Sequence, residues 1–318
     1  MEKKWDVIGL ANPILDMVLE MERLPESNTN CRLYEACFQG GGNVTTALAV
    51  CGMLGLRSSV LGVVGDDMAG NANIADFKFN HVDTTHLIVD PGKRTNLCVC
   101  ITERYNKGKE FLSRGGDCRQ LEVADLDEGF IKSARMLHIG LFTPAVVQAC
   151  EWIHESGGKV SIDAAYYRPD IYENYRHIDV FIGSETYFDA MGGGKDVEAA
   201  MRAIQKQGPE TVIFTFGSKG CCGVCADKYF EMPPFKVDVV DTTGAGDVFH
   251  GAYDYAYLQG WDAARCARFA SAASAVKCTH LGGRAGIANL ATLTRFLETG
   301  VIDDAEIKER VCRYRRGF

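Results

Sequence analysis

Short apolar stretches alternate with helical patterns along the first two-thirds of this 318-residue chain. The stretches typical of short buried strands are residues 6–10, 60–65, 136–141, 159–163, 179–183 and 211–216. Helical periodicity lies between them, at residues 44–54, 69–79, 144–156 and 195–207. This alternation predicts an α/β fold with a parallel sheet and helices on both faces. Ligands of such sheets bind at the C-terminal ends of the strands.

The pattern changes after Gly220. Residues 221–226 and 229–232 predict an antiparallel hairpin, and the valines of 237–240 predict the end of a further strand. Helical patterns follow from Asp247, including residues 262–279, 290–298 and 303–314. Since no repeat or linker divides the chain, we expect residues 1–318 to form a single domain.

Four further extended stretches do not fit the alternation. Residues 14–21 and 31–38 form one pair, while 95–102 and 109–114 predict a hairpin around Asn106, Lys107 and Gly108. Together they have the length and number of strands for a small second sheet.

Composition excludes several classes of protein. A formal net charge of −8 argues against nucleic acid as a main partner, which would favour a basic face. The N-terminus lacks a signal-peptide pattern, and no apolar run approaches the ~18 residues of a membrane span, so we expect a cytoplasmic protein without a membrane partner. The 13 cysteines lack the paired spacing of a zinc site and favour reduced core thiols.

The run from Asp241 to Asp247 joins a predicted strand end to a helical pattern. Gly244, Ala245 and Gly246 therefore form the turn that opens a helix, whose first N–H groups have no partner within the helix and attract anions. Asp247 follows in the first turn, where a carboxylate can take a proton from a hydroxyl that attacks phosphorus. Glycines with an early Asp can also simply form a turn and a helix cap.

The full seven-residue string resembles the signature of the ribokinase-like carbohydrate kinases of the phosphofructokinase-B (pfkB) type. The resemblance spans nearly the whole chain. It implies a three-layer sandwich with a mostly parallel central sheet and a small β-sheet lid, here from residues of about 14–38 and 95–114. It also implies ATP-dependent phosphorylation of a primary hydroxyl on a sugar or sugar-like molecule, and a homodimer through the lid. Asp247 would be the catalytic base, and the amides of Gly244, Ala245 and Gly246 would form the anion hole.

The same resemblance assigns residues to the acceptor. Asp16, at the end of the string Asn12-Pro13-Ile14-Leu15-Asp16, matches a hydroxyl-binding Asp, although a lone Asp after a strand is commonly a turn residue. Gly42 and Asn43 open a helical pattern near the substrate. Thr46 stands where relatives usually have a substrate-binding Asn.

The nucleotide side is assigned in the same way. Residues 215–220 resemble the family's T-x-G-x-x-G loop, so Thr215, Gly217 and Gly220 would contact the nucleotide. Lys219 would reach a phosphate or remain an exposed turn lysine. Gly282, in the glycine-rich loop 281–286, would lie by the adenine.

Metal ions follow from the same comparison. Ser184 and Tyr187 replace both ends of the family's N-x-x-E motif, so Glu185 is the candidate to hold magnesium through water, with MgATP as the cofactor. Asp241 and Thr243 lie where relatives bind a monovalent cation such as K+.

Three readings of the acceptor stay open. Strings around residues 235–252 and 277–287, with Thr46, look close to the sulfofructose kinase branch, in which Arg284 would meet an anionic substrate. Asn12-Pro13-Ile14-Leu15-Asp16 is also reminiscent of adenosine kinases and favours a nucleoside kinase. The altered N-x-x-E motif is compatible with a non-catalytic sugar-binding homologue.

Overall fold

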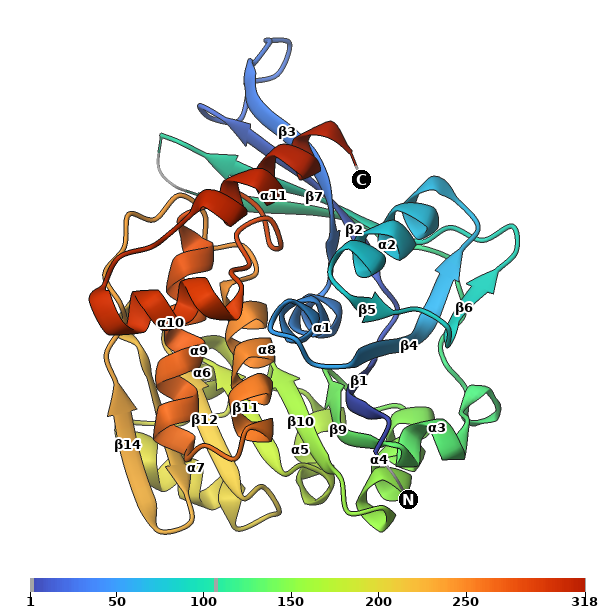
Figure 1. The fold of residues 1–318 in the computed structure, drawn as a ribbon, viewed down its shortest axis with the longest axis vertical. Coiled ribbons are helices and arrows are strands. Elements are labelled where there is room, and N and C mark those ends of the chain that lie inside the picture. Colours follow the sequence, from blue (N-terminus) through green and yellow to red (C-terminus); the bar gives the residue numbers. More distant parts are fainter. Residues whose placement is uncertain (1–2, 106–107, 318) are drawn as a thin grey trace.

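The computed structural model describes residues 3–105 and 108–317. Within them a ten-stranded sheet forms the middle layer, in the order β14-β13-β12-β11-β10-β9-β1-β4-β5, with β6 paired to β4 (Figure 1). All neighbours are parallel except β12, β13 and β14, which pair antiparallel. The strands are β1 (Trp5–Leu10), β4 (Ser58–Gly65), β5 (Val82–Asp83), β6 (Leu87–Asp90), β9 (Ala134–Ile139), β10 (Lys159–Ala164), β11 (Val180–Ser184), β12 (Thr211–Thr215), β13 (Cys221–Cys225) and β14 (Lys228–Met232).

Helices cover both faces because successive side chains of a buried strand point to opposite sides. In β1, Val7 belongs to one apolar core and Ile8 to the other. The first core packs under α1 (Asn43–Met53), α2 (Met68–Phe79), α8 (Ala245–Leu258), α9 (Ala263–Cys278) and α10 (Leu290–Thr299). The second packs under α3 (Glu128–Lys132), α4 (Pro144–Glu155), α5 (Pro169–Tyr172), α6 (Glu185–Ala190) and α7 (Val197–Gln205). The α/β prediction of a three-layer sandwich is confirmed.

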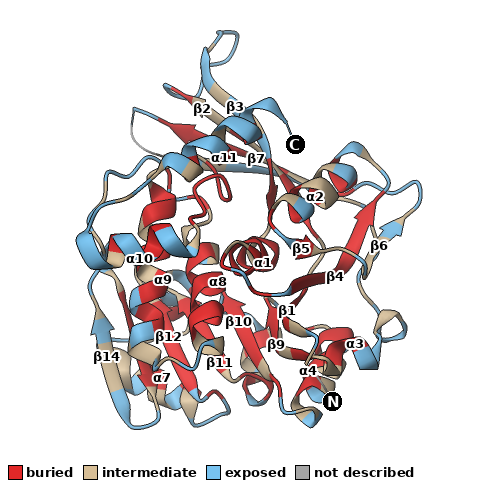
Figure 2. Ribbon diagram, viewed as in Figure 1, coloured by how far each residue is buried: buried red, intermediate tan, exposed pale blue. Residues whose placement is uncertain are grey.

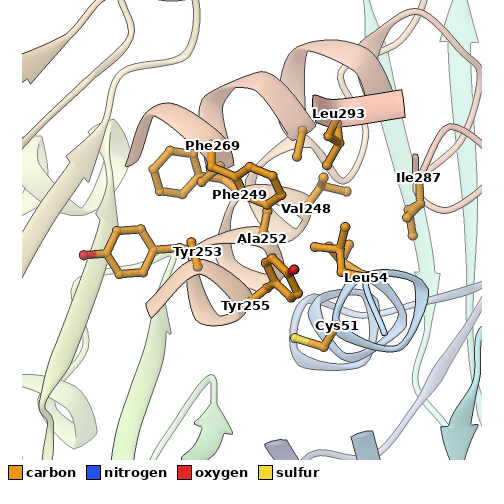
Figure 3. Close-up of a cluster of buried hydrophobic side chains, with 14 of the residues drawn as sticks. Cys51, Leu54, Val248, Phe249, Ala252, Tyr253, Tyr255, Phe269, Ile287 and Leu293 are labelled. Carbon is orange, nitrogen blue, oxygen red and sulfur yellow. The ribbon is translucent and has the colours of Figure 1, made fainter. Parts of the chain in front are cut away.

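Helices α1 and α8 lie side by side at the centre of the first layer and are buried almost all round (Figure 2). A side chain at Gly251 would collide with the carbonyl oxygen of Ala47, so this glycine lets the two backbones approach closely. Val248, Phe249 and Ala252 pack toward Leu54, the residue that follows α1, and Phe269 of α9 (Figure 3). The packing fixes where α8 begins, and therefore where its first turn lies.

A second, four-stranded sheet lies at one end of the molecule (Figure 1). Its order is β3-β2-β7-β8, from β2 (Ile14–Met21), β3 (Leu33–Gly41), β7 (Asn96–Glu103) and β8 (Lys109–Arg114). The extended stretches predicted from the sequence thus join as one sheet, while two residues of the predicted hairpin turn, 106 and 107, lie outside the described residues. The C-terminal helix α11 (Ala305–Arg316) packs against β3.

One predicted strand is wrong. Residues 233–240 form no strand, although three of the last four are valines. Val239 and Val240 are 40% and 43% exposed, and Pro233 and Pro234 have no N–H with which to continue a ladder after β14. The segment is instead held at its end, where the N–H groups of Val240 and Asp241 donate to the carbonyl of Cys278.

The short strands β5 and β6, at one edge of the main sheet, were not predicted from the sequence. No helix in the described part of the chain has both the length and the apolar character needed to cross a bilayer.

Candidate active site

The first turn of α8 forms a corner with free backbone donors. Gly244 precedes the helix in a left-handed conformation (φ 71°), and a side chain there would collide with the α-carbon of Gly283. The Ala245 N–H donates to the carbonyl of Thr242 at 3.2 Å. Among the described residues the N–H groups of Gly244 and Gly246 have no acceptor. The predicted three-amide anion hole is therefore corrected to two donors, because the amide of Ala245 closes the turn.

Asp247 lies in this first turn, and the residue as a whole is partly exposed. Loss of hydration raises the pKa of Asp247 to about 6, and the nearby carboxylate of Asp163 adds to the rise. The charges of His250, Arg284 and Lys277 oppose the shift. A carboxyl that titrates near neutral pH at a helix N-terminus is suited to accept a proton.

A buried histidine–carboxylate pair, not predicted from the sequence, acts on the pKa of Asp247. His250 Nε2, one turn along α8, lies 3.3 Å from Asp163 Oδ1 at the end of β10. Burial disfavours the imidazolium, but Asp163 still raises the pKa of His250 above its ordinary value. Despite its burial, Asp163 has a lowered pKa, because His250 pairs with it and the amide of Asn43 donates to it. Asp163 ends a strand at the ligand-binding edge of the sheet, a position that could have revealed it.

Asp16 reaches the site from β2 of the small sheet. A side chain at Gly41 would collide with the Asp16 carboxyl, so the carboxyl lies directly over the backbone that leads into α1. Burial raises the pKa of Asp16 to about 7; Arg284 opposes this and the charge of Asp247 adds to it. The charge of Asp247 acts on Asp16, so the two carboxyls lie in the same region of the structure. Gly42 and Asn43 begin α1 beside them.

Thr46 and Arg284 are engaged with each other. Arg284 is fully buried, and its guanidinium pairs with Asp76 of α2 and donates to the hydroxyl of Thr46 (3.3 Å) and the carbonyl of Gly41 (3.1 Å). The geometry gives Thr46 a structural role in place of the predicted acceptor contact. Arg284, predicted to meet an anionic substrate, is instead paired with Asp76 and has no exposed surface.

Asp241 organises the turn before α8. Its carboxylate accepts from the N–H (2.9 Å) and hydroxyl (2.8 Å) of Thr243 and from the N–H of Gly282 (2.7 Å). Its carbonyl accepts from the ammonium of Lys277, a fully buried lysine of α9, at 2.8 Å. Burial lowers the pKa of Lys277, while Asp241 opposes that shift. The Lys277 ammonium therefore contacts one of the two residues predicted to hold a monovalent cation, through its main-chain carbonyl.

The predicted nucleotide loop follows β12. Gly217 and Gly220 have positive φ (53° and 94°), and Thr215 donates to the carbonyl of Gly183 at 3.4 Å. Lys219 is exposed and its ammonium lies 2.7 Å from the carboxylate of Glu185. The two residues predicted for phosphate and magnesium thus contact each other, in a surface pair that contributes little stability and separates easily.

The altered N-x-x-E motif has a structural explanation. Ser184 caps α6, since its hydroxyl accepts from the N–H of Tyr187 at 3.1 Å. Tyr187 is fully buried and its hydroxyl lies 2.6 Å from that of Tyr175. An acidic residue at position 187 would lack water and a cation there, so the local core explains the tyrosine.

Comparison with known proteins fixes the family. Residues 3–289 match the model of the pfkB family carbohydrate kinases. The chain belongs to the pfkB family of carbohydrate kinases. The prediction from the Asp241–Asp247 string is therefore confirmed at the level of family and fold.

Relatives of this pfkB kinase include enzymes with different acceptors. It is 26% identical over 307 residues to a ribokinase of Haemophilus influenzae, covering 94% of this chain and 99% of that protein. It is 25% identical over 278 residues to a nucleoside kinase of Methanothermobacter thermautotrophicus, covering 86% and 89%. Arabidopsis thaliana ribokinase, solved with ribose and ATP, has the same fold with a TM-score of 0.79 at 20% identity, covering 94% of this chain and 99% of that one.

Proposed function

We propose that this pfkB kinase transfers the γ-phosphoryl group of ATP to a primary hydroxyl of a sugar or sugar-like molecule. The observation that carries the proposal is the position of Asp247 beside the unpaired N–H groups of Gly244 and Gly246. A base and an anion site in one helical turn are what in-line attack of an alcohol on phosphorus requires.

The acceptor would lie between Asp16, Asn43 and Asp247. Asp16 and Asn43 bind its hydroxyls, and Asp247 takes the proton of the attacking hydroxyl. The new bond joins that oxygen to the γ-phosphorus, the bond to the β-phosphate oxygen breaks, and ADP leaves. The N–H groups of Gly244 and Gly246 stabilise the charge on the transferred group.

The nucleotide would lie across the loop of Thr215, Gly217 and Gly220, with Gly282 beside the adenine. The fit of magnesium rests on Glu185, whose carboxylate is partly exposed and can hold the ion through water once Lys219 turns toward a phosphate. Bound magnesium neutralises phosphate charge. We assign Lys277 the role that the sequence suggested for K+, because its ammonium already donates to the Asp241 carbonyl.

A nucleoside acceptor is the second candidate. The nucleoside kinase relative and the string ending in Asp16 motivate it. Asn12 of that string has a structural role, since its carbonyl oxygen accepts from the N–H of Val63 at 2.9 Å and its amide donates to the carbonyl of Arg119 at 2.9 Å. Because the Asn12 side chain is already engaged within the fold, the string is weaker support for a nucleoside acceptor than an Asn free to bind substrate would be.

We further propose that residues 1–318 act as one cytoplasmic kinase domain and dimerise through the lid, the four-stranded sheet of residues of about 14–38 and 95–114. Its outer face carries the apolar cross-strand row Phe38, Met17, Val99 and Leu112. Such a flat row on a small sheet suits a second copy of the same surface.

The test is an acceptor panel with MgATP, measuring ADP release for hexoses, sulfonated and phosphorylated sugars, pentoses and nucleosides. We expect one sugar to give by far the highest kcat/KM, and no turnover by Asp247→Ala. A nucleoside as the sole good acceptor would establish the second candidate. Binding of sugar and MgATP by calorimetry with no turnover on any acceptor would establish a non-catalytic protein.

A further inference from the structure

The inner face of the lid carries two thiols and a carboxyl in one place. Asp16 of β2 lies opposite Cys98 of β7, and Val18 lies opposite Cys100, so all these side chains share a face. The ligand atoms of Asp16, Cys98 and Cys100 all lie within 4.8 Å of one another. The two cysteines are 8% and 3% exposed.

The spacing of the thiols fits a tetrahedral soft-metal site. The sulfur atoms of Cys98 and Cys100 are 3.8 Å apart. Two sulfurs each about 2.3 Å from Zn²⁺ at a tetrahedral angle are themselves about 3.8 Å apart. The strand maintains this spacing, because residues i and i+2 point to the same side. Two reduced thiols in van der Waals contact have a similar separation. The Asp16 carboxyl beside them is therefore the observation that points to a set of metal ligands.

The surroundings supply a third ligand beside the two thiols. The Asp16 carboxyl provides a hard oxygen ligand of the kind that Zn²⁺ also accepts. On the far side of Cys98, the hydroxyl of Ser113 lies 3.5 Å from the sulfur. Ile14, Val18 and Leu281 pack around the two thiols, and Cys37 of β3, opposite Val18, packs against the same cluster.

We propose that Asp16, Cys98 and Cys100 bind a soft divalent cation of the Zn²⁺ class, and that the bound cation excludes the acceptor. The second half rests on the proposed function, because it assumes that Asp16 contacts the acceptor. Binding involves no redox step: each thiol gives its proton to solvent and its sulfur bonds to the metal.

Cobalt titration of the full-length protein tests the site. Chelator-treated protein receives Co²⁺, whose tetrahedral thiolate complexes absorb strongly, and Zn²⁺ is then added as competitor. We expect one Co²⁺ per chain with a thiolate charge-transfer band that Zn²⁺ removes. Cys98→Ser and Cys100→Ser should each weaken Co²⁺ binding by more than about tenfold, since even indirect partners of a metal site contribute that much.

Two matched variants control for other thiols. Cys31→Ser removes a half-buried thiol of the segment before β3, and Cys312→Ser removes the exposed thiol of α11. Both should bind Co²⁺ as the wild type does. Absence of a thiolate band in the wild type, or an equal loss in the Cys31→Ser or Cys312→Ser protein, overturns the site.

A separate measurement tests exclusion of the acceptor. At fixed free Zn²⁺ and saturating MgATP, the KM for the acceptor should rise while kcat stays constant, and Cys98→Ser should remove the effect. Metal binding with an unchanged acceptor KM overturns the exclusion and leaves the site. Because the cobalt titration needs no turnover, failure of the proposed kinase activity cannot be mistaken for failure of the metal site.

Discussion

The buried ammonium of Lys277 donates to the carbonyl oxygen of Asp241 at 2.8 Å, 36 residues away in sequence. The same aspartate binds Thr243 and Gly282 through its carboxylate. One residue of α9 thus joins the turn before α8 and the glycine-rich loop after α9. It also places a fixed positive charge near Asp247, whose pKa it lowers.

We expect activity to be independent of the monovalent cation. Replacing K+ by Na+ or tetramethylammonium should leave kcat and the KM for ATP unchanged, because the protein provides the charge. Lys277→Met should lower the melting temperature, since it leaves the buried carbonyl of Asp241 without this donor, and an unsatisfied buried polar group costs about 1–3 kcal/mol. The exposed Lys206 provides the control, as Lys206→Met should melt like the wild type. Stimulation of the wild type by K+ alone would refute this assignment.

Asp247→Asn should lower kcat by about 10²–10⁴-fold, the usual contribution of a general base. ATP affinity should stay close to that of the wild type, because the backbone donors remain. The exposed Asp189 gives a matched control, and Asp189→Asn should be fully active. Single-turnover kinetics and nucleotide titration measure the two quantities, and a kcat near wild type would exclude Asp247 as the base.

The same substitution should stabilise the protein at high pH. The folded-state pKa of Asp247 is about 6, above its ordinary value of 3.8, so the folded chain holds this proton more tightly than the unfolded chain. Stability from this group is therefore lost as pH rises from about 4 to about 6. We expect Asp247→Asn to melt higher than the wild type at pH 8 and equally at pH 3.5, as measured by calorimetry. Equal melting at both pH values would contradict the raised pKa.

The α/β architecture followed from the sequence because buried parallel strands are short, nearly continuous apolar runs between helical patterns. The valines of 237–240 show the same apolar character in a segment that is half exposed and forms no strand. The local sequence pattern cannot distinguish a buried strand from an exposed irregular segment, since the difference lies in which other residues pack over it.

The candidate site was partly predictable for a related reason. Asp16, Asn43 and Asp247 lie in short motifs, whereas Asp163, His250 and Lys277 come from separate elements and meet only in the fold. Arg284 illustrates the limit: its partner Asp76 lies 208 residues away, so the sequence suggested a substrate contact for a fully buried ion pair. Likewise, the bond that occupies the Ala245 amide depends on the turn geometry.

The His250–Asp163 pair should set the pH at which activity appears. Because Asp247 must be ionised, kcat/KM should rise with pH through about 6 and then level off. His250 lowers the pKa of Asp247, so the neutral substitution His250→Gln should move the rise to higher pH. The His154→Gln variant, altered in a partly exposed pair with Asp179, should keep the wild-type profile. A loss of kcat/KM by His250→Gln that is equal at every pH would instead indicate a purely structural role.

Dimerisation through the lid depends on which face of the four-stranded sheet is free. Gln39 and Asp16 are paired across β3 and β2 and face the main domain, where Gln39 accepts from the N–H groups of Arg284 and Ala285. Phe38 precedes Gln39 in β3, and Leu112 precedes Ser113, the residue of β8 that pairs with Cys98. Both side chains therefore point to the opposite face of the sheet, and they are 37% and 61% exposed.

Leu112→Glu places a charge in that apolar row. We expect it to halve the mass measured by light scattering while circular dichroism stays unchanged, because β8 is an edge strand and the substitution leaves the cores intact. Leu290→Glu makes an equivalent change at a 37% exposed leucine of α10 and should leave the mass unaltered. A monomeric wild type would show that the chain forms no dimer. A Leu112→Glu protein with the mass of a dimeric wild type would show that the dimer contact lies elsewhere. In either case the exposed row would be a feature of the monomer surface.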